Sequence, residues 1–159
     1  KAIQAAKYKV QIVNPYFLPT HSVKKALKNA LKRGVKMEIM LSSKADIGFT
    51  PDGSAHVAHR LMKRGANVYL YNGGFHHSKI MMVDDLFCTI GTTNLDSRSL
   101  RYDYEVNAFI FDRGITHELS NIFEKDKTNS TVLTSKNWKK RSIWKRFVGW
   151  FANVLTPFL

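Results

Sequence analysis

Short apolar runs alternate with amphipathic segments along most of this chain, which is the pattern of an α/β domain. Apolar runs of strand length predict strands at 7–13, 35–41, 66–71, 79–83, 87–90 and 105–111, the last of them buried. Apolar residues spaced at i, i+3, i+4 and i+7 predict helices at about 20–33, 54–64 and 115–127. This order of elements predicts a mixed β-sheet with helices on both faces.

Polar stretches mark the expected connections between these elements. Residues 42–53 are rich in Ser, Gly, Asp and Pro and predict a loop, and residues 125–136 read as a polar linker. Residues 2–6 resemble the end of a helix that is already under way. We therefore expect one α/β domain over residues 1–130 and a separate tail over residues 131–159.

The tail combines aromatic residues with lysine and arginine. On a helix, one apolar stripe would contain Ile143, Phe147, Trp150, Phe151, Val154 and Leu155. Tryptophan beside basic residues is typical of a helix that lies at a membrane interface. The alternative is a helix docked on its own domain, and both arrangements can hold for different faces of the same helix.

The charge balance limits the class of partner. The 159 residues contain 25 Lys and Arg against 12 Asp and Glu, a formal net charge of +13, which favours nucleic acid, an anionic membrane or a phosphorylated substrate. The single cysteine, Cys88, lies in an apolar run and is expected to be a buried free thiol. No apolar run reaches the roughly 18 residues that a membrane-spanning helix needs.

One spaced set of polar residues carries the chemistry. His77, Lys79, Asp84, Gly91 and Asn94 form the pattern H-x-K-x4-D-x6-G-[ST]-x-N around a predicted hairpin. If the first hairpin strand continues back to residue 77, the histidine and the lysine project from the same face. A histidine nucleophile beside an ammonium group and an amide provides the catalytic and binding groups that phosphodiester transfer needs. Taken singly, each residue has an ordinary reading as strand edge, turn or bend.

The pattern resembles the HKD signature of the phospholipase D superfamily. The longer run from Gly91 to Phe109, the segment from Asn14 to Pro19 and the tail are similar to the C-terminal half of bacterial cardiolipin synthases. That resemblance covers nearly the whole chain and implies a phospholipase D-like fold. Members of this family carry two HKD motifs, whereas one is present here. We therefore expect the chain to be the C-terminal half of a two-motif enzyme.

The resemblance also implies roles for individual residues. His77 would be the nucleophile that forms a phosphohistidine intermediate, and Glu105 would orient the imidazole, unless it balances Arg101 at a strand edge. Lys79 and Asn94 would bind phosphoryl oxygens.

At two further motif positions, Thr92 and Asp84, the implied role is less direct. Thr92 replaces the serine more common in the family and would contribute a hydroxyl contact to the phosphate. Asp84 belongs to the catalytic set by its place in the motif, but its turn position equally suits a supporting role.

A complete site would need a second histidine to protonate the leaving alcohol. His76 is expected on the opposite strand face, and His56 with His59 on a solvated helix face. His21 would line the substrate entrance. The missing group would then come from the other HKD half or from a homodimer. No metal or other cofactor is expected, because no carboxylate cluster suits Mg²⁺.

The resemblance implies transfer of a phosphatidyl group between two phosphatidylglycerol molecules, which gives cardiolipin and glycerol. The expected partners are phosphatidylglycerol, the membrane surface and the second half, with nucleic acid disfavoured by the aromatic tail. The expected place is the cytoplasmic side of a bacterial cytoplasmic membrane. Two alternatives stay open: a single-motif phosphodiesterase or nuclease that acts as a homodimer, and a non-catalytic membrane-binding fragment.

Overall fold

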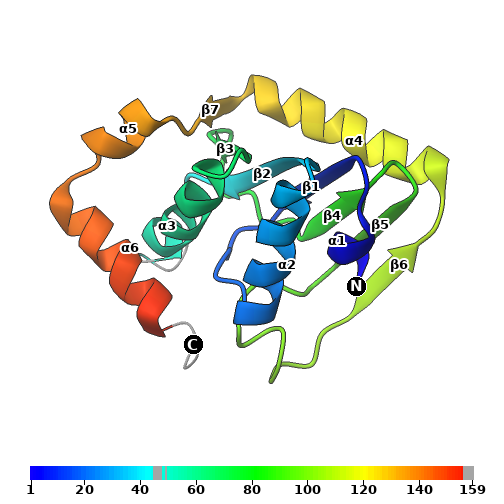
Figure 1. Cartoon of the computed structure of the whole chain (residues 1–159), viewed down its shortest axis with the longest axis horizontal. Helices are drawn as coiled ribbons and strands as arrows, with labels where there is room; N and C mark the ends of the chain where they lie inside the picture. The colour runs from blue at the N-terminus through cyan, green and yellow to red at the C-terminus, as the bar shows by residue number, and fades with distance from the viewer. Residues whose placement is uncertain (45–47, 49, 156–159) are drawn as a thin grey trace.

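A seven-stranded mixed β-sheet organises the chain in the computed structural model, which describes residues 1–44, 48 and 50–155 (Figure 1). The strands lie in the order β6-β5-β4-β1-β2-β3-β7. Their bounds are β1 Lys9–Val13, β2 Lys36–Ser42, β3 Asn67–Tyr71, β4 Ile80–Val83, β5 Phe87–Gly91, β6 Asn107–Ile110 and β7 Ser130–Val132. The expected α/β class, with a mixed sheet and helices on both faces, is confirmed.

Helices cover the two faces unequally. The six helices are α1 Ala2–Ala5, α2 His21–Lys32, α3 Thr50–Met62, α4 Arg113–Thr128, α5 Ser135–Lys140 and α6 Ile143–Leu155. The larger core joins the sheet to α1, α2 and α3, for example Ile12 and Ile39 to Leu27. Phe123 of α4 packs on the other face against Met40 and Met82. Side chains alternate between these two cores along each central strand, as strand geometry requires.

The strand directions decide which chain segments meet at each of the two ends of the strands. β1, β2 and β3 are parallel, whereas β4 is antiparallel to β1, β5 to β4 and β6 to β5. The start of β4, the end of β5 and the start of β6 therefore lie at the same end of the sheet as the carboxyl end of β1. The turn between β4 and β5 lies at the opposite end, beside the start of β1.

The expected start of α3 and the expected burial of residues 105–111 are wrong. α3 begins at Thr50, four residues before the expected start. Pro51 was expected to belong to the loop, but proline is well suited to the first turn of a helix. The predicted buried strand at 105–111 is β6, a sheet edge on which Phe109 and Phe111 are exposed. Neither buried core of the described residues includes Phe109, because β6 is the last strand of the sheet and no helix of the described chain packs over this side chain.

The predicted linker at 125–136 is also wrong. α4 continues to Thr128, and β7 then pairs antiparallel with β3 from Tyr69↔Val132 to Tyr71↔Ser130. The proposed boundary between residues 130 and 131 falls inside this strand. Polar residues suit β7 because it is a short edge strand with one partner.

The tail helix α6 packs on α3 through small residues. A Cβ added to Gly149 would lie 2.4 Å from the backbone oxygen of Asp52, and one added to Gly53 would lie 3.1 Å from the Cβ of Ala152. The predicted apolar stripe faces away from this contact, with Trp150 50% and Phe147 50% exposed. Only the backbone of the last stripe residue, Leu155, lies within the described part of the helix. In the described ranges, no helix has the length and apolar character needed to cross a membrane.

The prediction of a solvated face for His56 and His59 is wrong. His59 is 7% exposed, and its ring stacks on Trp138 of α5 with centroids 4.1 Å apart. His56 is half-buried beside the same indole. The tail folds back on α3 and covers both rings, a tertiary contact that helix periodicity alone does not contain.

Candidate active site

The open end of the β4–β5 hairpin gathers most of the motif. His77 and Lys79 come immediately before β4, Gly91 ends β5, and Thr92 and Asn94 follow it. These five residues line one open pocket of about 280 Å³. β4 begins at Ile80, so the strand does not continue back to residue 77, and the condition under which His77 and Lys79 would share a strand face is not met. The backbone oxygen of Lys79 nevertheless accepts a hydrogen bond from Gly91 N at 3.3 Å, which holds the two motif segments together.

His77 is exposed and lies between aromatic rings. Tyr16 presents an edge to its imidazole with centroids 6.3 Å apart, and the ring of Phe75 lies 5.0 Å away. Lys79 Nζ donates to the backbone oxygen of His77 at 2.7 Å. The imidazole is thus restrained by packing while its ring stays open to the pocket, with a positive charge beside it.

Asn94 has hydrogen-bonding capacity left over. Its amide oxygen is buried and, among the described residues, has no hydrogen-bond partner. A buried polar atom without a partner costs free energy. The described residues contain three other such atoms, on His56, Thr89 and Arg141, but only that of Asn94 belongs to a residue of this pocket. The side chain lines the same pocket as His77. The amide is therefore available to a polar ligand in that pocket.

Glu105 is engaged with Thr92. The Thr92 hydroxyl donates to the Glu105 carboxylate and accepts from Val106 N at 3.0 Å. No hydrogen bond joins His77 to Glu105, although both lie in the described part of the chain. Glu105 is thus joined to the pocket through Thr92, which lines it.

Gly91 is required by a close approach to the next strand. A Cβ at this position would lie 1.7 Å from Asn107 Oδ1 and 2.2 Å from the backbone oxygen of Val106. Asn107 in turn donates to Thr93 Oγ1 at 2.7 Å. The glycine of the motif lets β6 close against the segment that carries Asn94.

The loop after β1 lies beside the pocket residues, and the sequence interpretation did not assign it a supporting role. The Asn14 side-chain oxygen accepts from Leu95 N and from Tyr16 N, each at 3.2 Å. Tyr16 and Phe75, which contact the His77 ring, were both missed. The signal that could have found Tyr16 is its place directly after a buried strand, at the end of the sheet where the carboxyl end of β1 lies.

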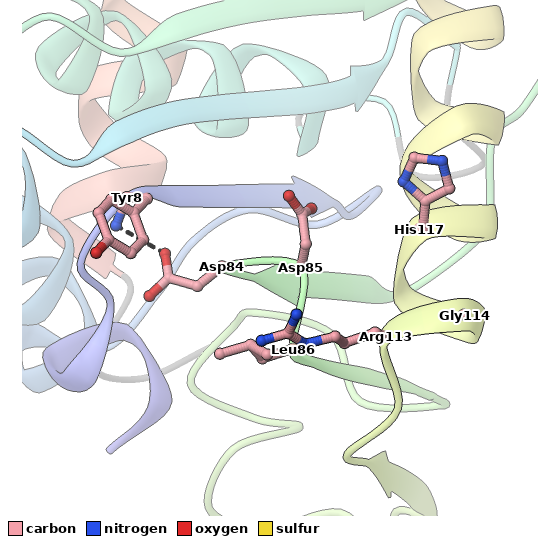
Figure 2. A pocket seen from close by; sticks show the side chains of 7 residues that line it. All are labelled: Tyr8, Asp84, Asp85, Leu86, Arg113, Gly114 and His117. Carbon is pink, nitrogen blue, oxygen red and sulfur yellow. Dashed lines mark hydrogen bonds between the residues drawn. The ribbon is translucent and has the colours of Figure 1, made fainter.

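Asp84 lies at the other end of the hairpin, away from the His77 pocket (Figure 2). Its carboxylate accepts three backbone hydrogen bonds from the chain entering β1: Lys7 N at 2.7 Å, Tyr8 N at 2.8 Å and Lys9 N at 2.7 Å. Asp84 lines a second hollow, of about 580 Å³, together with Arg113 and His117. Figure 2 draws the side chains that line it. The structure does not bring Asp84 together with the other motif residues.

The backbone and the electrostatics explain why an aspartate occupies this turn. Asp84 and Asp85 both adopt φ of 53°, a left-handed conformation that Asp tolerates better than most residues. Burial by itself would raise the pKa of the Asp84 carboxyl, but the hydrogen bonds from Lys9, Lys7 and Tyr8 outweigh it and lower the pKa below its ordinary value. The carboxylate is held in its charged form as a brace between the hairpin and β1.

The other histidines lie outside the pocket. His76 does not line the pocket, and its Nε2 lies 3.1 Å from an Asp126 carboxylate oxygen on α4. His21 lies in a separate hollow beside Lys24, which contradicts its expected place at the substrate entrance. Across residues 1–44, 48 and 50–155, no group of three or more His, Cys, Asp or Glu side chains could hold a metal ion.

The family match and the similar sequences both indicate the same protein family. Residues 1–127 match the family described as "Cardiolipin synthase, PLD-like domain". The chain is 40% identical over its full length to Cardiolipin synthase 1 of Staphylococcus epidermidis and 36% identical to Cardiolipin synthase of Listeria welshimeri. It spans about a third of the length of these curated relatives, 32% and 33% respectively.

Solved structures agree on the fold at much lower identity. Nuc of Salmonella typhimurium, a phospholipase D family member, superposes with a TM-score of 0.75 at 19% identity, covering 84% of this chain and 87% of Nuc. Phosphatidylserine synthase of Haemophilus influenzae superposes with a TM-score of 0.72 at 18% identity, covering 99% of this chain and 43% of the synthase. With the sequence relatives and the family match over residues 1–127, these likenesses place the chain in the phospholipase D-like domain family of cardiolipin synthases.

Proposed function

We propose that this chain supplies one half of an active site that transfers a phosphatidyl group between two phosphatidylglycerol molecules. The observation that carries the proposal is the pocket in which His77, Lys79 and Asn94 meet. It combines an accessible imidazole, an adjacent ammonium and an amide, whose NH2 group can donate to phosphoryl oxygens. The family to which the chain belongs selects the lipid substrate from among phosphodiesters.

The reaction proceeds in two displacements. A neutral ring nitrogen of His77 attacks phosphorus, a P–N bond forms, and the P–O bond to glycerol breaks as glycerol takes a proton from the acid group. The terminal hydroxyl of a second phosphatidylglycerol then attacks phosphorus and gives its proton to the same group, now a base. The P–N bond breaks and cardiolipin is released.

The phosphate-binding groups stabilise the charge that develops on the phosphoryl oxygens. Lys79 supplies a positive charge beside the nucleophile, and Asn94, which lines the same pocket, supplies its amide N–H groups as hydrogen-bond donors. Thr92 holds Glu105 in position through its hydroxyl. Glu105 is proposed to orient the imidazole once substrate is bound, since catalytic hydrogen bonds often tighten only in the complex.

The acid group is proposed to come from a second HKD half, either in the same parent chain or in a second copy. β6 is the edge strand of the sheet, and its first residue, Asn107, pairs with Gly91 of the pocket. Phe109 on β6 is 66% exposed and Phe111, directly after it, is 83% exposed, and Phe87 packs with both rings toward the turn end of the hairpin. This exposed aromatic cluster along the open edge of the sheet is a suitable surface for the other half to cover.

The membrane is the proposed location of this activity, on the cytoplasmic side of a bacterial cytoplasmic membrane. The exposed stripe of α6 and the basic residues around it suit the surface of an anionic bilayer, because apolar burial and attraction to anionic headgroups add together. This arrangement would hold the His77 pocket close to phosphatidylglycerol.

The test uses phosphatidylglycerol vesicles and the purified chain, alone and together with a second HKD half. Lipids are then separated and identified by mass spectrometry. His77-dependent cardiolipin supports the proposal, and its appearance with the chain alone identifies a homodimer. Phe109→Ser with Phe111→Ser should reduce the association of the two halves.

Two outcomes would overturn the proposal. The first is hydrolysis of single-stranded DNA with no lipid turnover in either preparation, which would favour the nuclease alternative. The second is vesicle binding without any turnover in the presence of the second half, which would favour a non-catalytic membrane-binding fragment.

A further inference from the structure

A basic hollow lies between α2, α3 and α6 and shares no residue with the His77 pocket. Its volume is about 310 Å³. His21, Lys24 and Lys28 line it from one face of α2, since residues three and four apart share a helix face. Arg60 of α3 and Asn153 of α6 complete its polar wall, and Val57 and Leu61 form an apolar floor.

The hollow is held in shape by a contact between two helices. Lys24 Nζ donates to Asn153 Oδ1 at 2.7 Å, which joins α2 to α6 across the opening. α6 is itself seated on α3 through Gly149. Three helices therefore fix the relative positions of the basic groups, so the hollow is part of the packed structure.

The positive charge in this hollow has no counter-charge. Neither α2 nor α6 contains an acidic residue, and Asp52 of α3 is ion-paired with Arg141 instead. Within the described ranges, Lys24, Lys28 and Arg60 form no salt bridge with any carboxylate. Burial lowers the pKa of Lys24, and the like charges of Arg60 and Lys28 lower it further.

We propose that this hollow binds a phosphate group, carried either by an anionic lipid headgroup or by a free phosphate. Three cationic side chains that converge from two helices can neutralise an anion with several oxygens, and a guanidinium and an ammonium both suit phosphate. Bound phosphate would relieve the repulsion between Lys24, Lys28 and Arg60. This site is separate from the His77 pocket. The proposal of a phosphate site therefore does not depend on the proposed phosphatidyl transfer.

The surroundings allow a lipid source as well as a free ion. Asn153 on the wall of the hollow is followed on α6 by Val154, which is 47% exposed and belongs to the open apolar stripe. A headgroup in the hollow would therefore leave its acyl chains beside an apolar surface. A free phosphate would use the same basic groups without that surface.

The test compares two pairs of substitutions with equal loss of charge. Lys24→Gln with Arg60→Gln removes two groups of the hollow, and the glutamine amide keeps a donor for Asn153. Lys25→Gln with Lys63→Gln removes two exposed charges outside it. Inorganic phosphate is titrated into the ¹⁵N-labelled chain, with the Asn153 side-chain amide as the reporter. Flotation with vesicles of phosphatidylglycerol in phosphatidylcholine is the second assay.

The expected result is at least about tenfold weaker binding for the Lys24/Arg60 pair than for the Lys25/Lys63 pair in one assay or both. A selective loss confined to vesicles assigns a lipid headgroup, and a selective loss confined to inorganic phosphate assigns a free phosphate. If the two pairs of substitutions behave alike in both assays, the hollow is not a phosphate site. Arg60→Gln alone, at an exposed side chain, gives the same test should the pair fold poorly.

Discussion

The two ends of the β4–β5 hairpin carry parts of the same motif and differ in how far their polar groups are satisfied. At the open end, Asn94 keeps a buried amide oxygen without a partner in the described chain, and the His77 ring is held only by aromatic contacts. At the turn, Asp84 accepts three short backbone hydrogen bonds. Unsatisfied groups are available to a ligand, whereas satisfied groups stabilise the fold.

The comparison explains the spacing of the motif. The four residues between Lys79 and Asp84 are the four residues of β4, and the six between Asp84 and Gly91 complete the turn and run along β5. The spacing therefore records the dimensions of a hairpin. We infer that the aspartate of the motif fixes the hairpin to β1, while the histidine, lysine and asparagine face the substrate.

The largest expected effect is at the open end. His77→Ala should reduce turnover by at least about a thousandfold in any preparation that shows activity, because the nucleophile is lost. The measurement is the rate of cardiolipin formation, with the melting temperature as a check on folding. His76→Ala is the matched control, since that neighbouring side chain pairs with Asp126 on α4 and does not line the pocket. Equal activity in the two variants would contradict the assignment of His77.

Asn94→Ala should have the next largest effect on rate. We expect a loss of about a hundredfold in kcat, because one group that stabilises transition-state charge is removed. Steady-state kinetics on mixed vesicles give the value. Asn121→Ala, an exposed position on α4, is the control. An unchanged kcat would show that the unused amide of Asn94 does not meet the reacting phosphate.

Asp84→Asn should affect stability more than rate, which reverses the pattern of the open end. We expect the free energy of unfolding to fall by about 2–3 kcal/mol, because charged hydrogen bonds to three backbone groups become neutral ones. Denaturant unfolding measures this change. Asp85→Asn is the control, since Asp85 is exposed and its ion pair with Lys9 at 2.9 Å is worth under about 1 kcal/mol. A thousandfold loss of turnover in folded Asp84→Asn would return Asp84 to the catalytic set.

The pH dependence of stability distinguishes the contribution of Asp84 from that of His59, the buried histidine covered by the tail. Burial, with the nearby charges of Lys63, His56 and Arg146, lowers the pKa of His59 from 6.5 to about 4. Below pH 6.5 the unfolded chain binds a proton that the folded chain excludes. Stability should therefore fall as the pH drops from 6.5 towards 4, by up to about 1.4 kcal/mol per pH unit.

The Asp84 carboxyl titrates in the adjoining window. Its folded pKa lies below the ordinary value of 3.8, so its contribution is present above that value and is lost as the pH falls further. Unfolding curves at several pH values should show both regions. Burial also lowers the pKa of His56, so His59→Gln should reduce the upper slope, His59→Gln with His56→Gln should remove it, and exposed His117→Gln should leave it. A slope that survives the double substitution would point to another buried base.

The fold was predictable where the apolar pattern was strong and local. The strands around residues 10, 38, 69, 81 and 89, and the amphipathic α2, follow from periodicity, and the mixed sheet follows from their order. β6 and β7 were misjudged because both are edge strands, where covering depends on neighbours and not on the strand's own composition. The start of α3 was missed because Pro51 reads equally well as loop or first turn.

The sequence by itself determined the chemical inventory: an HKD motif at hairpin spacing, a surplus of positive charge and an aromatic basic tail. Only the tertiary structure decided which motif residues share a pocket, because strand direction sends His77 and Asp84 to opposite ends of the sheet. It also decided that α6 would seat its small residues on α3 and leave its aromatic stripe open. Spacing along a chain gives the separation of side chains within one element, whereas their meeting across elements depends on packing.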